Sequence, residues 1–366
     1  MTMPTLMKMQ RFDAPNALPI IHHDFHLRRF RWRRRFEARG RVLARDAVNA
    51  ILPPMRSATL TALVLALAGA VLADAATAQP SLRVPPAVDQ DPPIDAAHPA
   101  LSRAFRILSR GQHMNALLYL PAGRGPHPVV VMLHGLPGNE QNLDLAQVLR
   151  RAGWAVLTFH YRGTWGSEGT FDLDGVAEDA RTAVEWVQDP ANARASRLDA
   201  HRIVIVGHSM GGFAAADVCA THPGIRACIL IAPWDPSVDA HETAPMSAAQ
   251  RDRFAASALD DVDGRIRGPS ARQLVDILAA SGRRWQLAQF APQLARLPVL
   301  LILATRDDPD DKALGLLPAL RAAQAARLQV ETFATDHAFN DHRIALEIAV
   351  LEWIQALPSA AAAGRP

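Results

Sequence analysis

The segment Ile203-Val204-Ile205-Val206-Gly207-His208-Ser209-Met210-Gly211 joins a short apolar run to a serine flanked by glycines. Four consecutive β-branched residues favour a strand that is buried on both faces. The residues that follow, Gly212-Phe-Ala-Ala-Ala-Asp, are typical of a helix. Glycines at such a strand-to-helix turn permit a cramped backbone that lifts the serine hydroxyl above the edge of the sheet. Because the pentapeptide alone is weak evidence, this placement is what makes Ser209 a candidate nucleophile.

Further apolar runs occur on both sides of this segment and predict more buried strands. They cover residues 129–133, 155–159, 228–231 and 299–303. Between them lie helical patterns, of which 175–188 is the clearest. Its apolar residues Val176, Ala180, Ala183, Val184 and Val187 share one face, and the charged residues Glu178, Asp179, Arg181 and Glu185 lie elsewhere. Strands that alternate with helices predict an α/β fold with a mostly parallel sheet covered by helices on both faces.

The two ends of the predicted domain have patterns of their own. A hairpin is expected from 105–108 and 115–120, closed at Arg110-Gly111-Gln112. Near the other end, 328–333 predicts a strand, and a last helix is expected to begin near Asn340. That helix should bury Ile344, Ile348 and Leu351, with Glu347 and Glu352 outside.

The alternation of strands and helices stops between Trp234 and Leu297. This stretch is polar and is interrupted by proline and glycine, with helical pieces near 248–259 and 270–278. We therefore expect a core made of 104–233 plus 298–358, with 234–297 inserted as a small cap. Residues 79–103 are expected to form a linker, and 359–366 a disordered tail.

The N-terminal part predicts export. Residues 55–78 combine Arg56, an apolar run and a small-residue cleavage site at Ala76-Thr77-Ala78, with Ala73-Asp74-Ala75 as a second option. This layout is typical of a secretory signal peptide, so the mature protein is expected to be periplasmic or secreted, without stable membrane insertion. An uncleaved signal that anchors the chain to the inner membrane is the alternative. Residues 1–54 are then either an upstream extension that is not translated or a long basic n-region.

Charge excludes one class of partner. The whole chain carries a net charge of +3, but residues 1–54 alone carry eleven basic and four acidic residues. Residues 55–366 are therefore slightly acidic, and we expect no nucleic-acid partner. His22-His23-Asp24-Phe25-His26 has the composition of a metal site but lies in this doubtful segment, so no metal or cofactor is expected. Cys219 and Cys228 favour small buried hydrophobic residues, although a pair between them stays open.

A serine nucleophile needs a histidine base and an acid that orients it. In the predicted topology both should follow the serine, the acid before the histidine. Asp307 follows the strand 299–303 at its carboxyl end, where sites of such sheets lie. Asp308 and Asp235 are alternatives for the acid, whereas Asp310 and Asp311 favour the start of the next helix. His337, just before the last helix, is the predicted base; His342 favours a surface or capping position instead.

The developing oxyanion would need two backbone N–H donors. Met210 is expected to supply one, and Leu136 the other, from the loop His134-Gly135-Leu136-Pro137-Gly138 that follows the strand 129–133. Trp234, Trp285 and Phe290 either line a pocket or form the core of the cap. The residues predicted to contact substrate are His134, Gly135, Trp165, His208 and Trp234.

Four motifs in this order resemble those of the α/β-hydrolase superfamily over residues 104–357. They are the 134–138 loop, the serine turn, Ala304-Thr305-Arg306-Asp307 and Asp336-His337-Ala338-Phe339. A fifth, 161–169, resembles a Tyr-Arg-Gly-x-Gly-x-Ser loop of bacterial members. The chain has Trp165 where glycine is usual, His160 where aspartate is frequent and Ala304 where glycine is common. The resemblance is strongest to the dienelactone-hydrolase and prolyl-oligopeptidase-like branch, and it implies that the fifth loop borders the site.

The sequence thus predicts an α/β-hydrolase fold and a serine hydrolase that acts on carboxylic esters without a cofactor. A serine peptidase that acts on short peptides is the alternative among enzymes. A non-catalytic binding protein on the same fold is the alternative outside them.

Overall fold

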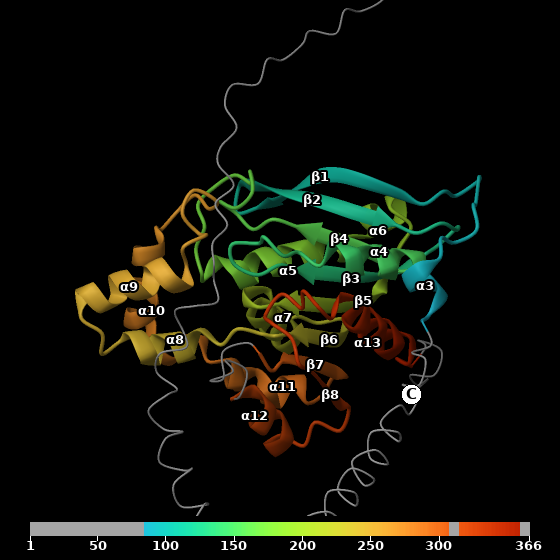
Figure 1. Ribbon diagram of the computed structural model, residues 1–366. Helices are drawn as coiled ribbons and strands as arrows, with labels where there is room; N and C mark the ends of the chain where they lie inside the picture. Colours follow the sequence, from blue (N-terminus) through green and yellow to red (C-terminus); the bar gives the residue numbers. More distant parts are fainter. Residues whose placement is uncertain (1–83, 307–314, 359–366) are drawn as a thin grey trace, which may run out of the picture. The chain divides into compact units, whose positions relative to one another are not determined.

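One mixed sheet organises the part of the chain that this computed structural model describes, residues 84–306 and 315–358 (Figure 1). The sheet has eight strands in the order β1-β2-β4-β3-β5-β6-β7-β8. β1 and β2 pair antiparallel, as do β2 and β4, and all pairs from β4 to β8 are parallel. The strands are β1 (Leu101–Ser109), β2 (Gln112–Leu120), β3 (His127–Leu133), β4 (Ala155–Phe159), β5 (Leu198–His208), β6 (Ile225–Ile231), β7 (Val299–Ala304) and β8 (Leu328–Phe333). The predicted fold class is confirmed.

The predicted hairpin is present and is longer than expected. Its turn consists of Arg110 and Gly111, whose φ angles are 46° and 74°. Positive φ at both central residues gives a two-residue turn whose twist matches that of the strands. The hairpin therefore pairs from Ser109 and Gln112 out to Leu101 and Leu120.

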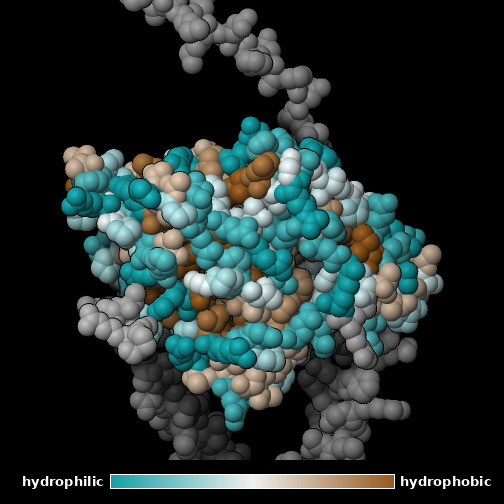
Figure 2. Space-filling view, turned by 180° about the vertical axis from the view of Figure 1, so that it is seen from behind, coloured by the Kyte–Doolittle hydropathy of each residue, from teal (hydrophilic) through white to brown (hydrophobic). Residues whose placement is uncertain are grey.

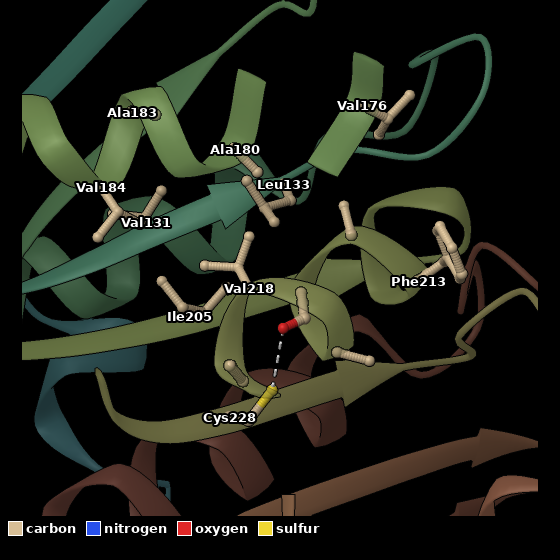
Figure 3. Close-up of a cluster of buried hydrophobic side chains, with 14 of the residues drawn as sticks. Val131, Leu133, Val176, Ala180, Ala183, Val184, Ile205, Phe213, Val218 and Cys228 are labelled. Atoms are coloured by element: carbon tan, nitrogen blue, oxygen red, sulfur yellow. Dashed lines mark hydrogen bonds between the residues drawn. The ribbon is translucent and has the colours of Figure 1, made fainter. Parts of the chain in front are cut away.

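Helices cover both faces of the sheet. One face carries α5 (Gly175–Gln188), α6 (Pro190–Ala195), α7 (Met210–Thr221), α11 (Ala291–Leu294) and α12 (Leu316–Ala322). The other carries α4 (Leu143–Arg151) and α13 (Arg343–Gln355), with α3 (Pro86–Asp89) beside them. Each face has its own cluster of buried apolar side chains. In the first cluster, Figure 3 shows side chains of α5 and α7 packed over Val131, Leu133 and Ile205 of the sheet.

Helix α5 has the predicted bounds and buries the predicted apolar face. The prediction for Asp179 was wrong, because this residue is buried at 2% exposure. Its carboxylate accepts hydrogen bonds from the Ser109 hydroxyl at 2.7 Å and from Arg162 Nε at 2.6 Å. Burial raises the pKa of Asp179 even so. A charged residue can occupy the inner face here because two partners from other segments reach it.

Helix α13 begins at Arg343, three residues after the predicted start, and the predicted burial of its residues is partly wrong. Ile344 is 59% exposed, whereas Glu347 is buried at 7% exposure. The buried apolar side chains are those of Leu346, Ile348, Val350, Leu351, Trp353 and Ile354. Apolar residues occur on nearly every side of this helix, so their spacing could not fix which side faces the sheet. Ion pairing of Arg343 with Asp144 of α4 holds the first turn.

Within residues 234–297, three helices lie beyond the carboxyl ends of the parallel strands, as Figure 1 shows for α8 to α10. These are α8 (Pro236–Thr243), α9 (Ala248–Ala258) and α10 (Ala271–Ser281), followed by the 3-10 helices η3 (Gly282–Trp285) and η4 (Leu287–Phe290). The two expected helical pieces correspond to α9 and α10. Trp285 and Phe290 are buried in the main core under the sheet rather than in a separate core of the cap. Phe290 contacts Phe213 of α7, with ring centroids 5.9 Å apart.

Several sequence predictions fall outside the described residues. The basic extension, the signal peptide, the tail and Asp307 all belong to residues 1–83, 307–314 and 359–366. The described part of the expected linker contains α3, whose first residue Pro86 has the φ that a helix start requires, and the start of β1. None of the described helices is both long and apolar enough to cross a membrane. The face seen in Figure 2 is largely hydrophilic, with its hydrophobic residues in small separate patches.

The two cysteines are free and buried, as the sequence favoured. Cys219 lies in α7 and Cys228 in β6. The Cys228 thiol approaches the Ala215 carbonyl oxygen at 3.7 Å (Figure 3). Burial next to Cys228 raises the pKa of the Cys219 thiol. Both side chains therefore contribute to the core as small hydrophobic groups.

Candidate active site

Ser209 lies directly after β5 and immediately before the first residue of α7. Its backbone has φ 57° and ψ −122°, a conformation that side-chain-bearing residues rarely adopt. The Ser209 N–H donates to the Ile231 carbonyl at 3.1 Å, and the Ser209 carbonyl accepts from Trp234 N–H at 2.9 Å. These bonds to the end of β6 and to the segment after it hold the strained turn. The side chain itself is only half-buried.

The glycines of this turn are required by close backbone contacts. A Cβ on Gly207 would lie 2.1 Å from the Gly211 carbonyl oxygen, and one on Gly211 would lie 2.2 Å from that of Leu133. A Cβ on Gly212 would lie 2.6 Å from Pro233 Cβ. The first turn of α7 therefore packs against β3 and β6 more closely than any side chain permits.

The loop after β3 lies against the serine. A Cβ added to Gly135 would be 2.9 Å from Ser209 Cβ and 3.4 Å from Ser209 Oγ. Leu136, the next residue, is half-buried, and Met210 begins α7 on the other side of Ser209. The structure thus brings the two predicted segments with N–H donors, 134–136 and 209–210, together around Ser209.

The loop that carries His337 reaches the same place from the other end of the chain. His208 Nε2 donates to the His337 carbonyl oxygen at 2.9 Å, and the two imidazole rings lie 4.8 Å apart. The Asp336 carboxylate fixes the loop by accepting from Asn340 N–H at 2.9 Å and from its side-chain amide at 2.8 Å. Phe339, fully buried at φ 57°, anchors it in the core. His337 is therefore held next to the residue that precedes Ser209.

The end of β7 is tied to this histidine loop. Arg306 N–H donates to the Thr335 carbonyl at 2.9 Å, and the Arg306 guanidinium pairs with Asp341. Asp341 also accepts from the Thr335 hydroxyl and contacts His342. These hydrogen bonds hold the pKa of Asp341 well below its usual range. Asp307 and Asp308 follow at once, and Asp310 and Asp311 shortly after; all four lie outside the described residues.

Asp235, an alternative for the acid, and His342, an alternative for the base, lie among the described residues and make other contacts. Asp235, at the start of α8, accepts from the Ser237 N–H and hydroxyl through Oδ1 and from Leu287 N–H through Oδ2 at 3.1 Å. Its carboxylate thereby joins α8 to η4, and burial raises its pKa. His342 occupies the N-cap position of α13 and contacts Asp341 at 2.9 Å, which fits the predicted capping position.

His134, at the start of the loop after β3, is buried, and its side chain is not exposed at the surface of the site. Its Nδ1–H donates to the Gly135 carbonyl at 2.7 Å, and its Nε2 lies 3.4 Å from His160 Nδ1. Tyr161 packs edge-on at 4.7 Å between ring centroids. Burial lowers the pKa of His134 to about 3, with a further contribution from His160. His134 is therefore a neutral residue that fixes the Gly135 carbonyl.

This pKa predicts a specific loss of stability in acid. Between the unfolded pKa near 6.5 and the folded value of about 3, the unfolded chain binds a proton at His134 that the folded chain does not. The free energy of unfolding should therefore fall as the pH is lowered through this range, by about 1.4 kcal/mol per pH unit for this residue. In His134→Asn the slope between pH 6 and pH 4, measured by urea unfolding, should be smaller by about that amount. Exposed His201→Asn is the matched control, and an unchanged slope in His134→Asn would contradict the assignment.

Trp165 holds the same loop from outside. Its indole N–H donates to the Pro137 carbonyl at 2.6 Å, and a Cβ on Gly138 would lie 2.9 Å from the same nitrogen. The residue has φ 45° and its side chain is 39% exposed. Its ring lies 6.0 Å from that of His160. Trp165 is thus a bulky residue at positive φ whose indole N–H is bound to the loop and whose ring is partly exposed to solvent. Its predicted contact with substrate stays a prediction.

Trp165→Phe should separate the hydrogen bond from the aromatic surface. It keeps a ring but leaves the Pro137 carbonyl without its donor, so the Leu136 N–H is less firmly placed. The sequence predicts this N–H as an oxyanion donor. Removing such a donor costs about 10²–10³-fold in kcat, so loosening it should cost about tenfold in kcat/KM. Stability should fall by only about 1 kcal/mol. Steady-state kinetics on a short ester and thermal unfolding provide the two readouts; wild-type kcat/KM would show that this bond does not position the loop.

Trp234 is half-buried, and its indole N–H donates to Asp239 Oδ2 at 2.6 Å. The Trp234 side chain also packs against the main core, and its indole N–H is bound to Asp239. The cap contacts the loops after β3 and β4 through other residues. Asn139 Nδ2 donates to Asp261 Oδ2 at 2.5 Å, and Thr164 pairs with Ile266 in an isolated bridge.

Sequence reasoning named His160 and Tyr161 only in connection with a family motif, and it did not predict the contacts by which these residues, Asn139 and Asp261 fix the loops. The only available signal was the 161–169 motif, which indicated that the loop borders the site without saying what it contacts. In the described ranges no three His, Cys, Asp or Glu side chains come close enough to bind a metal ion.

A mostly parallel sheet with a strained strand-to-helix serine, a preceding glycine loop and a later histidine loop defines the class of α/β hydrolases. A family model described as the alpha/beta hydrolase family matches residues 130–347. The chain belongs to this family.

Individual relatives match only parts of the chain. The lysophosphatidylserine lipase ABHD12 of Danio rerio is 32% identical over 103 residues, which cover 27% of this chain and 25% of that protein. Cutinase cut1 of Thermobifida fusca is 25% identical over 210 residues, 54% of this chain and 62% of that protein. The chain thus spans less than two thirds of the length of either relative.

Solved structures share the fold at low identity. An acylaminoacyl peptidase of Pyrococcus horikoshii aligns with a TM-score of 0.54 at 17% identity, covering 73% of this chain and 43% of that one. The Pyrococcus furiosus esterase Pf2001 aligns with a TM-score of 0.52 at 14% identity, covering 74% and 98%.

Proposed function

We propose that this protein is a serine hydrolase that cleaves carboxylic esters through an acyl-enzyme. The observation that carries the proposal is the strained Ser209 turn, packed against Gly135 and joined by His208 to the His337 loop. Strain of this kind is retained where the surrounding structure enforces it, and it concentrates at functional sites. A serine hydroxyl also needs a neighbouring base, and His337 is the candidate that the chain brings there.

In the proposed reaction Ser209 Oγ attacks the ester carbonyl and His337 accepts its proton. The backbone N–H groups of Leu136 and Met210 hold the oxyanion. His337 then protonates the departing alcohol, and water releases the acid from Ser209 by the same steps in reverse. Asp307 would hold the imidazole. The link from Arg306 to Thr335 supports this role, because it keeps the segment that leads into Asp307 beside the histidine loop.

The ester preference rests on relatives whose names are lipase and cutinase. A set of p-nitrophenyl esters of increasing acyl length, tested beside aminoacyl and dipeptidyl p-nitroanilides, examines it directly. The proposal expects turnover of the esters and no turnover of the anilides above the uncatalysed rate, because an activated ester is the easier substrate for a peptidase as well. Enzymatic cleavage of the anilides, abolished in Ser209→Ala, would replace the ester assignment with the peptidase alternative.

Labelling with a fluorophosphonate separates an enzyme from a binding protein on the same fold. The folded protein should form an adduct on Ser209, located by mass spectrometry of the digest, and Ser209→Ala should form none. Heat-unfolded wild type is the control for nonspecific labelling. A folded protein without an adduct would overturn the catalytic proposal.

The choice of acid gives a further prediction. Asp307→Asn should lower kcat by about 10³–10⁴-fold, because the imidazole loses the carboxylate that orients it and stabilises its charge. Asp308→Asn is the matched control and should stay within a few-fold of wild type. Steady-state kinetics on one short ester decides between them, and the reverse result would make Asp308 the acid.

We also propose that the protein is exported and that residues 55–78 are removed. N-terminal sequencing of the mature protein should find Gln79 as the first residue, or Gln79 preceded by the few residues after Ala75. A mature protein that still carries residues 55–78 would support the anchored alternative instead.

A further inference from the structure

A cleft lies toward the amino ends of the parallel strands, away from Ser209. It has a volume of about 650 Å³, within the range of small-molecule sites. Its walls come from the middle of β5, the start of β6, the residues just before β7 and β8, and the end of α13. Because Ser209 follows the carboxyl end of β5, the second half of that strand separates the two places. The cleft is therefore no part of the catalytic site.

The strand register brings three arginines to this cleft. Arg202 precedes Ile203, which pairs with Ile225, and Arg226 follows Ile225 on the neighbouring strand. Arg327 precedes Leu328, which pairs with Val299 of β7, and its carbonyl accepts from Val299 N–H at 2.9 Å. All three side chains line the cleft. Three arginines, from β5, from β6 and from the position before β8, thus line the same cleft.

None of the three guanidinium groups has a carboxylate partner among the described residues. Arg202 lies over the Trp154 ring at 5.8 Å, and Arg327 donates to the Arg296 carbonyl at 3.2 Å. Arg202 and Arg226 are half-buried. A partly desolvated guanidinium without a counter-charge favours an anion, and its planar donor fork fits the two oxygens of a carboxylate.

Apart from Gln355, the rest of the wall is apolar. Val204, Ile225 and Ile354 are buried behind it, whereas Leu297 and Leu357 are half-buried and Pro358 is exposed at its rim. A small inorganic anion would leave the three rim side chains in contact with water, whereas an aliphatic chain would cover them. We propose that this cleft binds an amphipathic carboxylate, its head group on the arginines and its aliphatic chain against Leu297, Leu357 and Pro358.

Calorimetric titration with dodecanoate, below its micelle concentration, tests the proposal on the whole protein. Dodecanoate should bind, and its affinity should fall as salt is raised. Acetate has the charge without the chain and dodecyl maltoside the chain without the charge; each should bind at least tenfold more weakly. Acetate or inorganic phosphate binding as tightly as dodecanoate would overturn the amphipathic ligand and leave a plain anion site.

Variants locate the binding. Arg226→Gln and Arg202→Gln should each weaken dodecanoate binding about tenfold, since each removes a charge-assisted hydrogen bond. Arg226→Lys keeps the charge without the fork and should lie between Arg226→Gln and wild type. Exposed Arg194→Gln of α6 is the matched control, and unchanged thermal unfolding shows that each variant is folded. Dodecanoate affinity that is insensitive to Arg202 and Arg226 would place the ligand elsewhere, including at the Ser209 edge, and would overturn the proposal.

Discussion

Ser209→Gly is expected to give a protein that is inactive and more stable than wild type. The wild-type residue is held at φ 57° and ψ −122°, which costs a side-chain-bearing residue about 1–3 kcal/mol. Glycine adopts this conformation freely but loses more backbone entropy on folding, by up to about 1 kcal/mol. The net gain in the free energy of unfolding should be about 1 kcal/mol. Hydrolysis of p-nitrophenyl esters should fall by about 10⁴-fold or more, because the nucleophile is gone.

Ser209→Ala is the matched control for the stability half of this prediction. It removes the hydroxyl but keeps Cβ, and with it the strain, so it should be as inactive as Ser209→Gly without the same gain in stability. Urea unfolding of the three proteins measures the difference. Equal stability of the glycine and alanine variants would mean that the turn is not strained, and an active Ser209→Ala would exclude Ser209 as the nucleophile.

Gly211→Ala should lose the fold rather than only the activity. The added Cβ would lie 2.2 Å from the Leu133 carbonyl oxygen and 2.6 Å from that of His134. Both oxygens belong to the backbone at the end of β3, which pairs with β4 and β5 on its two sides and cannot move away. Such overpacking against a fixed backbone should cost more than about 4 kcal/mol. Soluble yield and the unfolding midpoint provide the readout.

Gly264→Ala is the control for the glycine substitution itself. A Cβ there has nothing within 4 Å, although the residue has φ +82°. It should cost only about 1 kcal/mol, from backbone conformation alone. Equal unfolding temperatures for Gly211→Ala and Gly264→Ala would contradict the close packing of α7 on β3.

Inner strands were predictable because residues buried on both faces of a parallel sheet must be apolar in succession, and the run at 155–159 matches β4 to the residue. The edge strand β8 also has its predicted bounds, 328–333, although its residues are half-buried or exposed. Helix α5 was predictable for the related reason that only one of its faces is buried. The same reasoning failed for α13, where apolar residues surround the helix, and for Asp179, whose partners come from segments about 17 and 70 residues away.

The site was predictable where chain order restricts it. The segments around Ser209, His337 and Leu136 meet as expected, since each follows the carboxyl end of a strand. The contacts that hold these segments in place were not predictable. The bond from Trp165 to Pro137 and the contact between His134 and His160 join loops that follow different strands, and no spacing in the sequence encodes them. His134 and His208 illustrate the limit: both are near the serine, but both are buried residues that position backbone carbonyls.

The inner part of the cap shares its core with the main domain, and this restricts how the proposed hydrolase could acquire new specificity. Trp285, Leu287 and Phe290 pack into the same core as α7, and Asp235 bonds α8 to η4. A substitution there that reshapes the approach to Ser209 also removes packing from the helix that carries it, so gains in selectivity would cost stability. The outer helices differ in part, because Ala255, Ala271 and Val275 form a small cluster of their own, although Leu274 and Leu278 of α10 belong to the main core. Directed evolution of substrate range should therefore accumulate changes in α9 and α10 first and reach the inner residues only in a background that has been stabilised beforehand.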